Sequence, residues 1–107
     1  MTLSKGRSET PVTIHPADAI YDGTQTVTTA GTRVQLIATT TGCRLVNIYA
    51  LSTNTGNVYV GGATIASGRG MILEQARSTD WFPIDDLSKV YIDADNNGDG
   101  VAYAYVV

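Results

Sequence analysis

The sequence predicts an all-β fold, an antiparallel β-sandwich of jelly-roll-like type that is preceded by an extended N-terminal arm. Short runs rich in Val, Ile, Thr and Tyr recur about every ten residues, which is the spacing expected for a sandwich or small barrel. Eleven glycines separate these runs, as is typical of a chain with many tight turns. No stretch has the apolar periodicity of a helix longer than about one turn.

The chain divides at residue 32 into two predicted regions. Residues 1–32 are the predicted N-terminal arm and edge strand, and residues 33–107 are the predicted β-sandwich domain. Within the first region, 11–14 and 24–29 have the composition of short strands. Two interpretations stay open for its beginning: a frayed terminus, or an arm that lies on a neighbouring subunit. Ten extended residues span roughly 33 Å, which is long enough for the second interpretation.

Residues 33–73 have the pattern of successive strands and turns, with strands expected at 33–38, 43–51, 57–62 and 71–73. The strand at 43–51 is apolar on both faces. We therefore expect it to be central, and to be covered on both sides by a second sheet or a neighbouring subunit. The sequence Asn-Thr-Gly at 54–56 lies between two strand-like runs and predicts a hairpin turn.

Two adjacent aromatic residues, Trp81 and Phe82, begin the next strand. In a strand their side chains point to opposite faces, so one is expected in the core. The other needs a second surface, either a subunit interface or a nearby loop. Pro83 predicts that this strand lies at an edge or contains a bulge, because proline cannot donate a ladder hydrogen bond.

The C-terminal part predicts one turn of 3₁₀ helix and two further strands. Leu87 is the expected inward residue of the turn, and the strand at 89–94 has its apolar side chains on one face. The last strand, 101–107, places Tyr103 and Tyr105 on the same side. These tyrosines are interpreted either as core residues or as an exposed interface stripe or sugar-stacking platform. Because the chain ends within this strand, we expect it to be paired in the sheet.

Composition and charge exclude several classes of function. Only 16% of the residues are charged, below the usual quarter, which favours a surface used as an interface. A net charge of −3 with seven scattered Lys and Arg residues argues against nucleic-acid binding. No apolar run approaches the ~18 residues of a membrane span, and the first residues lack the apolar core of a signal peptide. We expect a chain that stays soluble in the cytoplasm where it is made.

Residues able to perform chemistry are few, and we predict no cofactor, no metal and no enzymatic activity. His15 is the single histidine, and Cys43 is the single cysteine, expected as a reduced, packed thiol. Residues 93–100 match the start of an EF-hand loop, but position twelve is Ala104, where a bidentate Glu belongs. We interpret this string as a hairpin turn, with calcium binding as the alternative.

Four strings carry a resemblance to a known class of protein: RVQL at 33–36, VNIYAL at 46–51, NTGNVYVG at 54–61 and IDDLSKVYIDA at 84–94. They resemble the small β-sandwich virion proteins of tailed bacteriophages, and the resemblance covers about residues 33–107. It implies a capsid decoration (cement) protein or a module of a head fibre or tail, often trimeric. It supplies no active-site residues.

The expected function is therefore that of a structural virion protein that stabilises the phage head by bridging capsomers. Its expected partners are the major capsid protein or another virion protein, together with two further copies of itself, since three weak contacts gain avidity. The alternative is a carbohydrate- or receptor-binding module of a phage tail or fibre. The expected interface residues are Val12, Ile14, Trp81, Phe82, Tyr103 and Tyr105.

Overall fold

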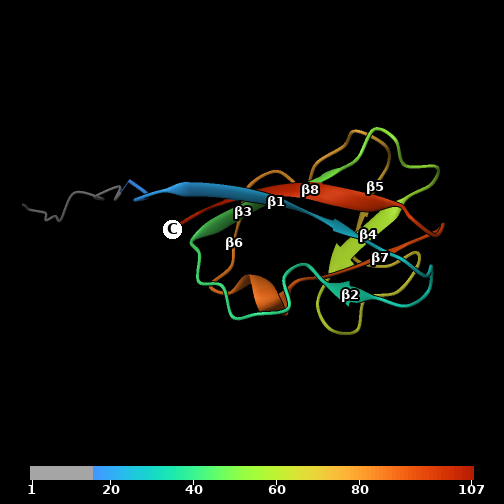
Figure 1. The fold of residues 1–107 in the computed structure, drawn as a ribbon, viewed down its shortest axis with the longest axis horizontal. Helices are drawn as coiled ribbons and strands as arrows, with labels where there is room; N and C mark the ends of the chain where they lie inside the picture. The colour runs from blue at the N-terminus through green and yellow to red at the C-terminus, as the bar shows by residue number, and fades with distance from the viewer. Residues whose placement is uncertain (1–15) are drawn as a thin grey trace, which may run out of the picture.

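The computed structural model describes residues 16–107, which form two four-stranded antiparallel sheets (Figure 1). The first sheet has the order β1 (Ile20–Thr26), β8 (Gly100–Val106), β3 (Leu45–Ala50) and β6 (Phe82–Pro83). The second has the order β2 (Val34–Gln35), β7 (Tyr91–Ala94), β4 (Val58–Gly61) and β5 (Met71–Leu73). The predicted antiparallel β-sandwich is confirmed. Val12, Ile14 and the predicted strand at 11–14 lie outside the described residues, so the N-terminal arm stays a prediction.

Successive strands alternate between the two sheets at all but one connection, since only β4 and β5 are consecutive and paired. The hairpins predicted at 54–56 and 93–100 are therefore wrong. The first connects β3 to β4 and the second connects β7 to β8, and both cross from one sheet to the other. The strand order agrees with the jelly-roll-like arrangement, which stays an interpretation.

The core lies between the sheets and is built from the inward side of each long strand. The predicted apolar face of Val90, Ile92 and Ala94 is fully buried. Leu87 is also fully buried, and it begins the predicted 3₁₀ turn, η1 (Leu87–Lys89), behind the N-cap residue Asp86. Alternate side chains of these strands therefore point into the space between the two sheets, where they form the core.

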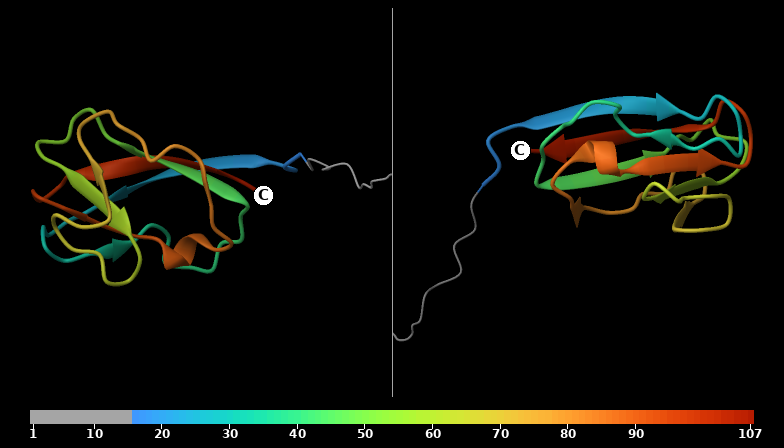
Figure 2. Two further views of the ribbon diagram at one scale, coloured as in Figure 1. Left: turned by 180° about the vertical axis from the view of Figure 1, so that it is seen from behind. Right: turned by 90° about the horizontal axis from the view of Figure 1, so that it is seen from below.

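The strands β1 and β8 form the longest pair, and they run side by side in both views of Figure 2. Strand β1 is an edge strand, but it begins at Ile20 rather than at the predicted residue 24, because its seven residues pair in register with β8. Val27, which follows it, is fully buried, so residues 20–27 pack as part of the sandwich. Strand β8 lies between β1 and β3, as expected for a paired C-terminal strand.

The predicted strand at 33–38 is wrong in its length, since only Val34 and Gln35 form β2. Leu36 is still buried, and its N–H donates to the Val90 carbonyl at 2.8 Å. Within the part of the chain that the structure describes, no helix is long and apolar enough to cross a membrane.

Candidate binding surface on the first sheet

The outer face of the first sheet is the side that points away from the second sheet, and its side chains form three cross-strand rows. The register that pairs β1, β8, β3 and β6 determines which residues share a row. The rows are Ile20–Val106–Leu45–Pro83, Asp22–Ala104–Asn47–Trp81 and Thr24–Ala102–Tyr49–Ser78. We call these twelve residues the outer face.

Strand β3 is apolar on both sides, but only one side is covered within the described chain. Val46 and Ile48 point into the core and are fully buried. On the outer face, Leu45 is 37% exposed and Tyr49 is 46% exposed. The predicted central position of this strand is confirmed, whereas the predicted cover on its second side is not provided by residues 16–107.

A β-bulge determines how Trp81 and Phe82 are placed. Thr79 donates its N–H to the Ile48 carbonyl at 2.8 Å, and Phe82 pairs with Val46. Two residues, Asp80 and Trp81, therefore stand opposite the single residue Asn47. Asp80 adopts the left-handed region, with φ of 60°. One extra residue in a strand reverses the side to which later side chains point.

Because of the bulge, the rings of Trp81 and Phe82 lie on opposite faces of the sheet, as predicted. Phe82 is half-buried against the core, and Trp81 lies on the outer face and is 46% exposed. Without the extra residue, alternation along the strand would place Trp81 inward and Phe82 outward. Strained backbone of this kind is concentrated at functional sites, where it orients a side chain.

A shallow hollow of about 240 Å³ lies beside Trp81 on the outer face. Tyr49 and Trp81 line it together with Asn47 and residues 102–104. The alanines at 102 and 104 add only methyl groups, which leaves space between the larger side chains. The Asn47 Oδ1 atom is fully buried and has no hydrogen-bond partner among the described residues. A buried acceptor left without a partner costs free energy, so it calls for an explanation.

The outer face carries little charge, and what it carries is negative. Asp22 is the only charged residue in the four strands of the first sheet. Asp80, exposed at the bulge, adds a second carboxylate beside the same row. The four strands contain no Lys or Arg, and neither Arg44 nor Arg77 lines the hollow. Weakly charged surface with exposed aromatic rings is the composition typical of interfaces.

Tyr103 and Tyr105 lie on the inner side of the first sheet and are half-buried against the core. Their ring centroids are 6.2 Å apart, and the Tyr21 ring continues the row at 5.6 Å from Tyr105. A Cβ at Gly23 would approach the Tyr103 hydroxyl to 2.5 Å, so glycine leaves the space that this ring occupies. The pKa of Tyr103 is raised, and burial of its ring is the main cause. These two tyrosines therefore do not contribute their rings to the outer face.

The carboxylates of residues 93–100 point to different parts of the protein. Asp93 accepts a hydrogen bond from the backbone of the loop before β2, Asp95 accepts one from the Tyr59 hydroxyl at 2.8 Å, and Asp99 accepts from the N–H groups of residues 55–56. Calcium binding requires that such oxygens converge on one point. No group of three or more His, Cys, Asp or Glu able to hold a metal exists within residues 16–107.

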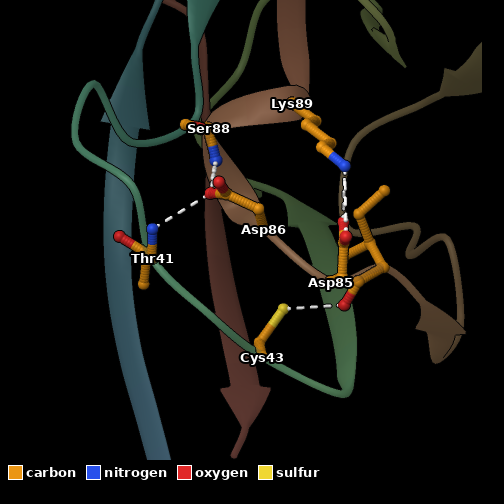
Figure 3. A network of polar contacts seen from close by, with 7 residues as sticks. Thr41, Cys43, Asp85, Asp86, Ser88 and Lys89 are labelled. Atoms are coloured by element: carbon orange, nitrogen blue, oxygen red, sulfur yellow. Dashed lines mark hydrogen bonds and ion pairs between the residues drawn. The ribbon is translucent and has the colours of Figure 1, made fainter.

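A polar network around Cys43 and Asp86 joins the loop before β3 to η1 (Figure 3). Asp86 accepts from the N–H groups of Thr41 at 3.0 Å and Ser88 at 2.9 Å, and these bonds lower the pKa of Asp86. The Cys43 thiol donates to the Ile84 carbonyl at 3.1 Å. Burial, more than the nearby carboxylates, raises the pKa of Cys43. The raised pKa keeps the Cys43 thiol protonated at neutral pH, so this thiol is not an activated nucleophile.

The hollow on the outer face includes two residues that the sequence analysis did not select, Asn47 and Tyr49. The sequence did offer a reason to select Asn47. In the otherwise apolar run 45–51, Asn47 and Tyr49 are the only residues with a polar side-chain group. His15 lies outside the described residues. No protein-family model, no curated protein and no solved structure matches this chain.

Proposed function

We propose that this chain is a structural virion protein, a capsid decoration (cement) protein that docks on its partner through the outer face. The observation that carries the proposal is the uncovered, weakly charged outer face, on which Ile20, Leu45, Tyr49 and Trp81 are exposed. Exposed apolar surface that is continuous over several strands marks an interaction site. The assignment to a phage head rests on the resemblance of residues 33–107 to virion proteins.

The small size of the outer face favours an assembly of several copies, and the resemblance to virion proteins implies that this assembly is a trimer. Four strands about 4.8 Å apart, with three rows about 7 Å apart, present roughly 400 Å². A stable, specific interface buries about 800 Å² on each partner. One outer face alone therefore binds weakly. Three copies that dock together on neighbouring capsomers gain affinity by avidity without a stronger contact at any one of them.

The hollow favours a second candidate function, a carbohydrate- or receptor-binding module of a tail or fibre. Its volume of about 240 Å³ is below the roughly 300 Å³ of the smallest drug-sized pockets, which suits a ligand of the size of one sugar ring. The Tyr49 and Trp81 rings at its border provide apolar surface, and Asn47 provides a polar group.

The test is binding of the purified full-length chain to phage heads assembled without it, followed by sedimentation. We expect the chain to sediment with the heads and to raise the temperature at which they release DNA. The double variant Tyr49→Ala/Trp81→Ala is expected to lose most of this binding. Ile72→Ala is the matched control, because Ile72 is 53% exposed but lies on the second sheet. Circular dichroism verifies that both variants fold.

Two results would contradict the proposal. The first is binding to heads that the double variant leaves unchanged, because the outer face would then not be the docking surface. The second is a chain that fails to sediment with heads but binds methyl glycosides, which would favour the second candidate. Light scattering of the free chain measures whether it is already a trimer before it meets the heads.

A further inference from the structure

We propose that the hollow between Tyr49 and Trp81 receives the side chain of an arginine from the partner protein, an inference that rests on the proposed docking role of the outer face. The proposal specifies the chemistry of the partner's contacting residue. Three observations carry it: an unpartnered acceptor, aromatic rings at the border, and an excess of negative charge.

The unpartnered acceptor is the Oδ1 atom of Asn47, which is fully buried although Asn47 lines the hollow. Rotation of the amide about its terminal torsion exchanges Oδ1 and Nδ2, so the same side chain is able to present its oxygen to the hollow. A guanidinium has five N–H donors and no acceptor. A partner arginine therefore donates to this oxygen in the second orientation of the amide, in which Oδ1 faces the hollow and Nδ2 takes the buried position.

Tyr49 and Trp81 border the hollow, and each residue is 46% exposed. A guanidinium stacks on aromatic faces, and Trp gives the strongest cation–π attraction of the aromatic residues. Between the rings, the methyl groups of Ala102 and Ala104 leave space for the aliphatic stem of the arginine to lie against the sheet. Trp, Tyr and Arg are also the residues that most often dominate binding at interfaces.

Charge favours a cation over a neutral ligand. Asp22 lies in the same cross-strand row as Asn47, and Asp80 stands opposite Asn47 in the bulge. The four strands themselves contain no Lys or Arg, and neither flanking arginine, Arg44 or Arg77, lines the hollow. A lysine ammonium is a strongly hydrated point charge, whereas the planar guanidinium stacks and bonds to several acceptors at once. A neutral sugar would gain nothing from the negative charge.

The test is a nuclear magnetic resonance titration of the ¹⁵N-labelled full-length chain with short capped peptides. The probes are Ac-Gly-Arg-Gly-NH₂, the same peptide with citrulline, which has nearly the same shape but no charge, and the same peptide with lysine. Trp81 is the only tryptophan, so its indole N–H gives one resolved signal. We expect saturable shifts with the arginine peptide, with affinity roughly tenfold lower for citrulline and for lysine, a difference of about 1.4 kcal/mol.

The variants Asn47→Ala and Asp80→Asn are each expected to weaken binding of the arginine peptide severalfold, and Ile72→Ala is expected to leave it unchanged. Added salt should also weaken binding, because the two carboxylates are exposed to solvent. Equal shifts with the arginine and citrulline peptides would overturn the proposal. Tighter binding of a methyl pyranoside than of the arginine peptide would overturn it in favour of a sugar site.

The two proposals fail in different ways. If the chain binds the arginine peptide at Trp81 but does not sediment with phage heads, the arginine site stands and the cement role is refuted. If the chain sediments with heads through the outer face but its Trp81 signal does not respond to the arginine peptide, docking stands and the arginine site is refuted.

Discussion

The substitution Asn54→Ala tests the contact that joins the β3–β4 connection to β8. Asn54 is 2% exposed, and its side chain bonds both backbone groups of one residue. Its Nδ2 donates to the Gly100 carbonyl at 2.9 Å, and its Oδ1 accepts from the Gly100 N–H at 2.9 Å. The Asn54 carboxamide thereby takes the place of a neighbouring strand's backbone as hydrogen-bond partner of Gly100, because β3 has ended and the chain turns toward the second sheet.

The expected loss of stability follows from the bonds that remain after the substitution. The Gly100 carbonyl keeps a hydrogen bond from the Leu51 N–H at 3.2 Å. The Gly100 N–H, which is buried, is left without its acceptor, and an unsatisfied buried donor costs about 1–3 kcal/mol. Together with the loss of the Nδ2 bond to the Gly100 carbonyl, which is worth about 1 kcal/mol, we expect the free energy of unfolding to fall by about 3 kcal/mol. That is a large part of the roughly 5–15 kcal/mol available to a domain.

The assay is urea unfolding, followed by far-ultraviolet circular dichroism and by the fluorescence of the single tryptophan. In a thermal melt followed by the same signals, a loss of about 3 kcal/mol lowers Tm by roughly 10–20 °C in a domain of this size. The control is Asn96→Ala, because Asn96 is exposed in the β7–β8 connection, and we expect it to change stability by less than about 0.5 kcal/mol. An Asn54→Ala variant as stable as this control would refute the reasoning.

Three further predictions follow from single contacts. Gly100→Ala should lower the free energy of unfolding by about 1–3 kcal/mol in urea, because its Cβ would lie 2.4 Å from the Gln25 carbonyl oxygen; an unchanged value would contradict this. Backbone hydrogen bonds, first from Thr41, lower the pKa of Asp86, so its contribution to stability is present above about pH 4 and is lost as pH falls through the lowered pKa. The Tm of Asp86→Asn should therefore fall less than that of the wild type between pH 5 and pH 3. Burial raises the pKa of Cys43, so alkylation by iodoacetamide should be slow at pH 7 and accelerate on unfolding in urea; equal rates would contradict this.

The strands were predictable from the sequence to the extent that burial alternates locally. The alternation of Val90, Ile92 and Ala94 depends only on the two-residue period of a strand, and all three are buried as predicted. The partners of each strand were not predictable in the same way. A turn such as 54–56 has the same residue types whether the chain returns to the same sheet or crosses to the other one. The contact that fixes the path of this connection, between Asn54 and Gly100, joins residues 46 positions apart in the sequence.

The candidate site was predictable only in part for a similar reason. Adjacency predicts that Trp81 and Phe82 face opposite sides, but it does not determine which of them faces outward. That choice is made by one extra residue at Asp80, which adopts a positive φ although it is not glycine. The hollow likewise depends on Asn47 and Ala104 being cross-strand neighbours, a pairing between residues far apart in the sequence.

The fold alone does not account for the outer face. An antiparallel sheet needs one buried side to be stable, and the other side is ordinarily polar. Here the second side is apolar along β3 and β8, with a fully buried acceptor on Asn47 that has no partner in residues 16–107. The left-handed backbone at Asp80 costs on the order of 1–3 kcal/mol, and its result is a tryptophan ring placed in solvent. A partner docked on the outer face would cover the exposed rings, whose hydration lowers the stability of the isolated chain. A binding role therefore gives one explanation for the exposed apolar side chains and for the strained backbone that places one of them.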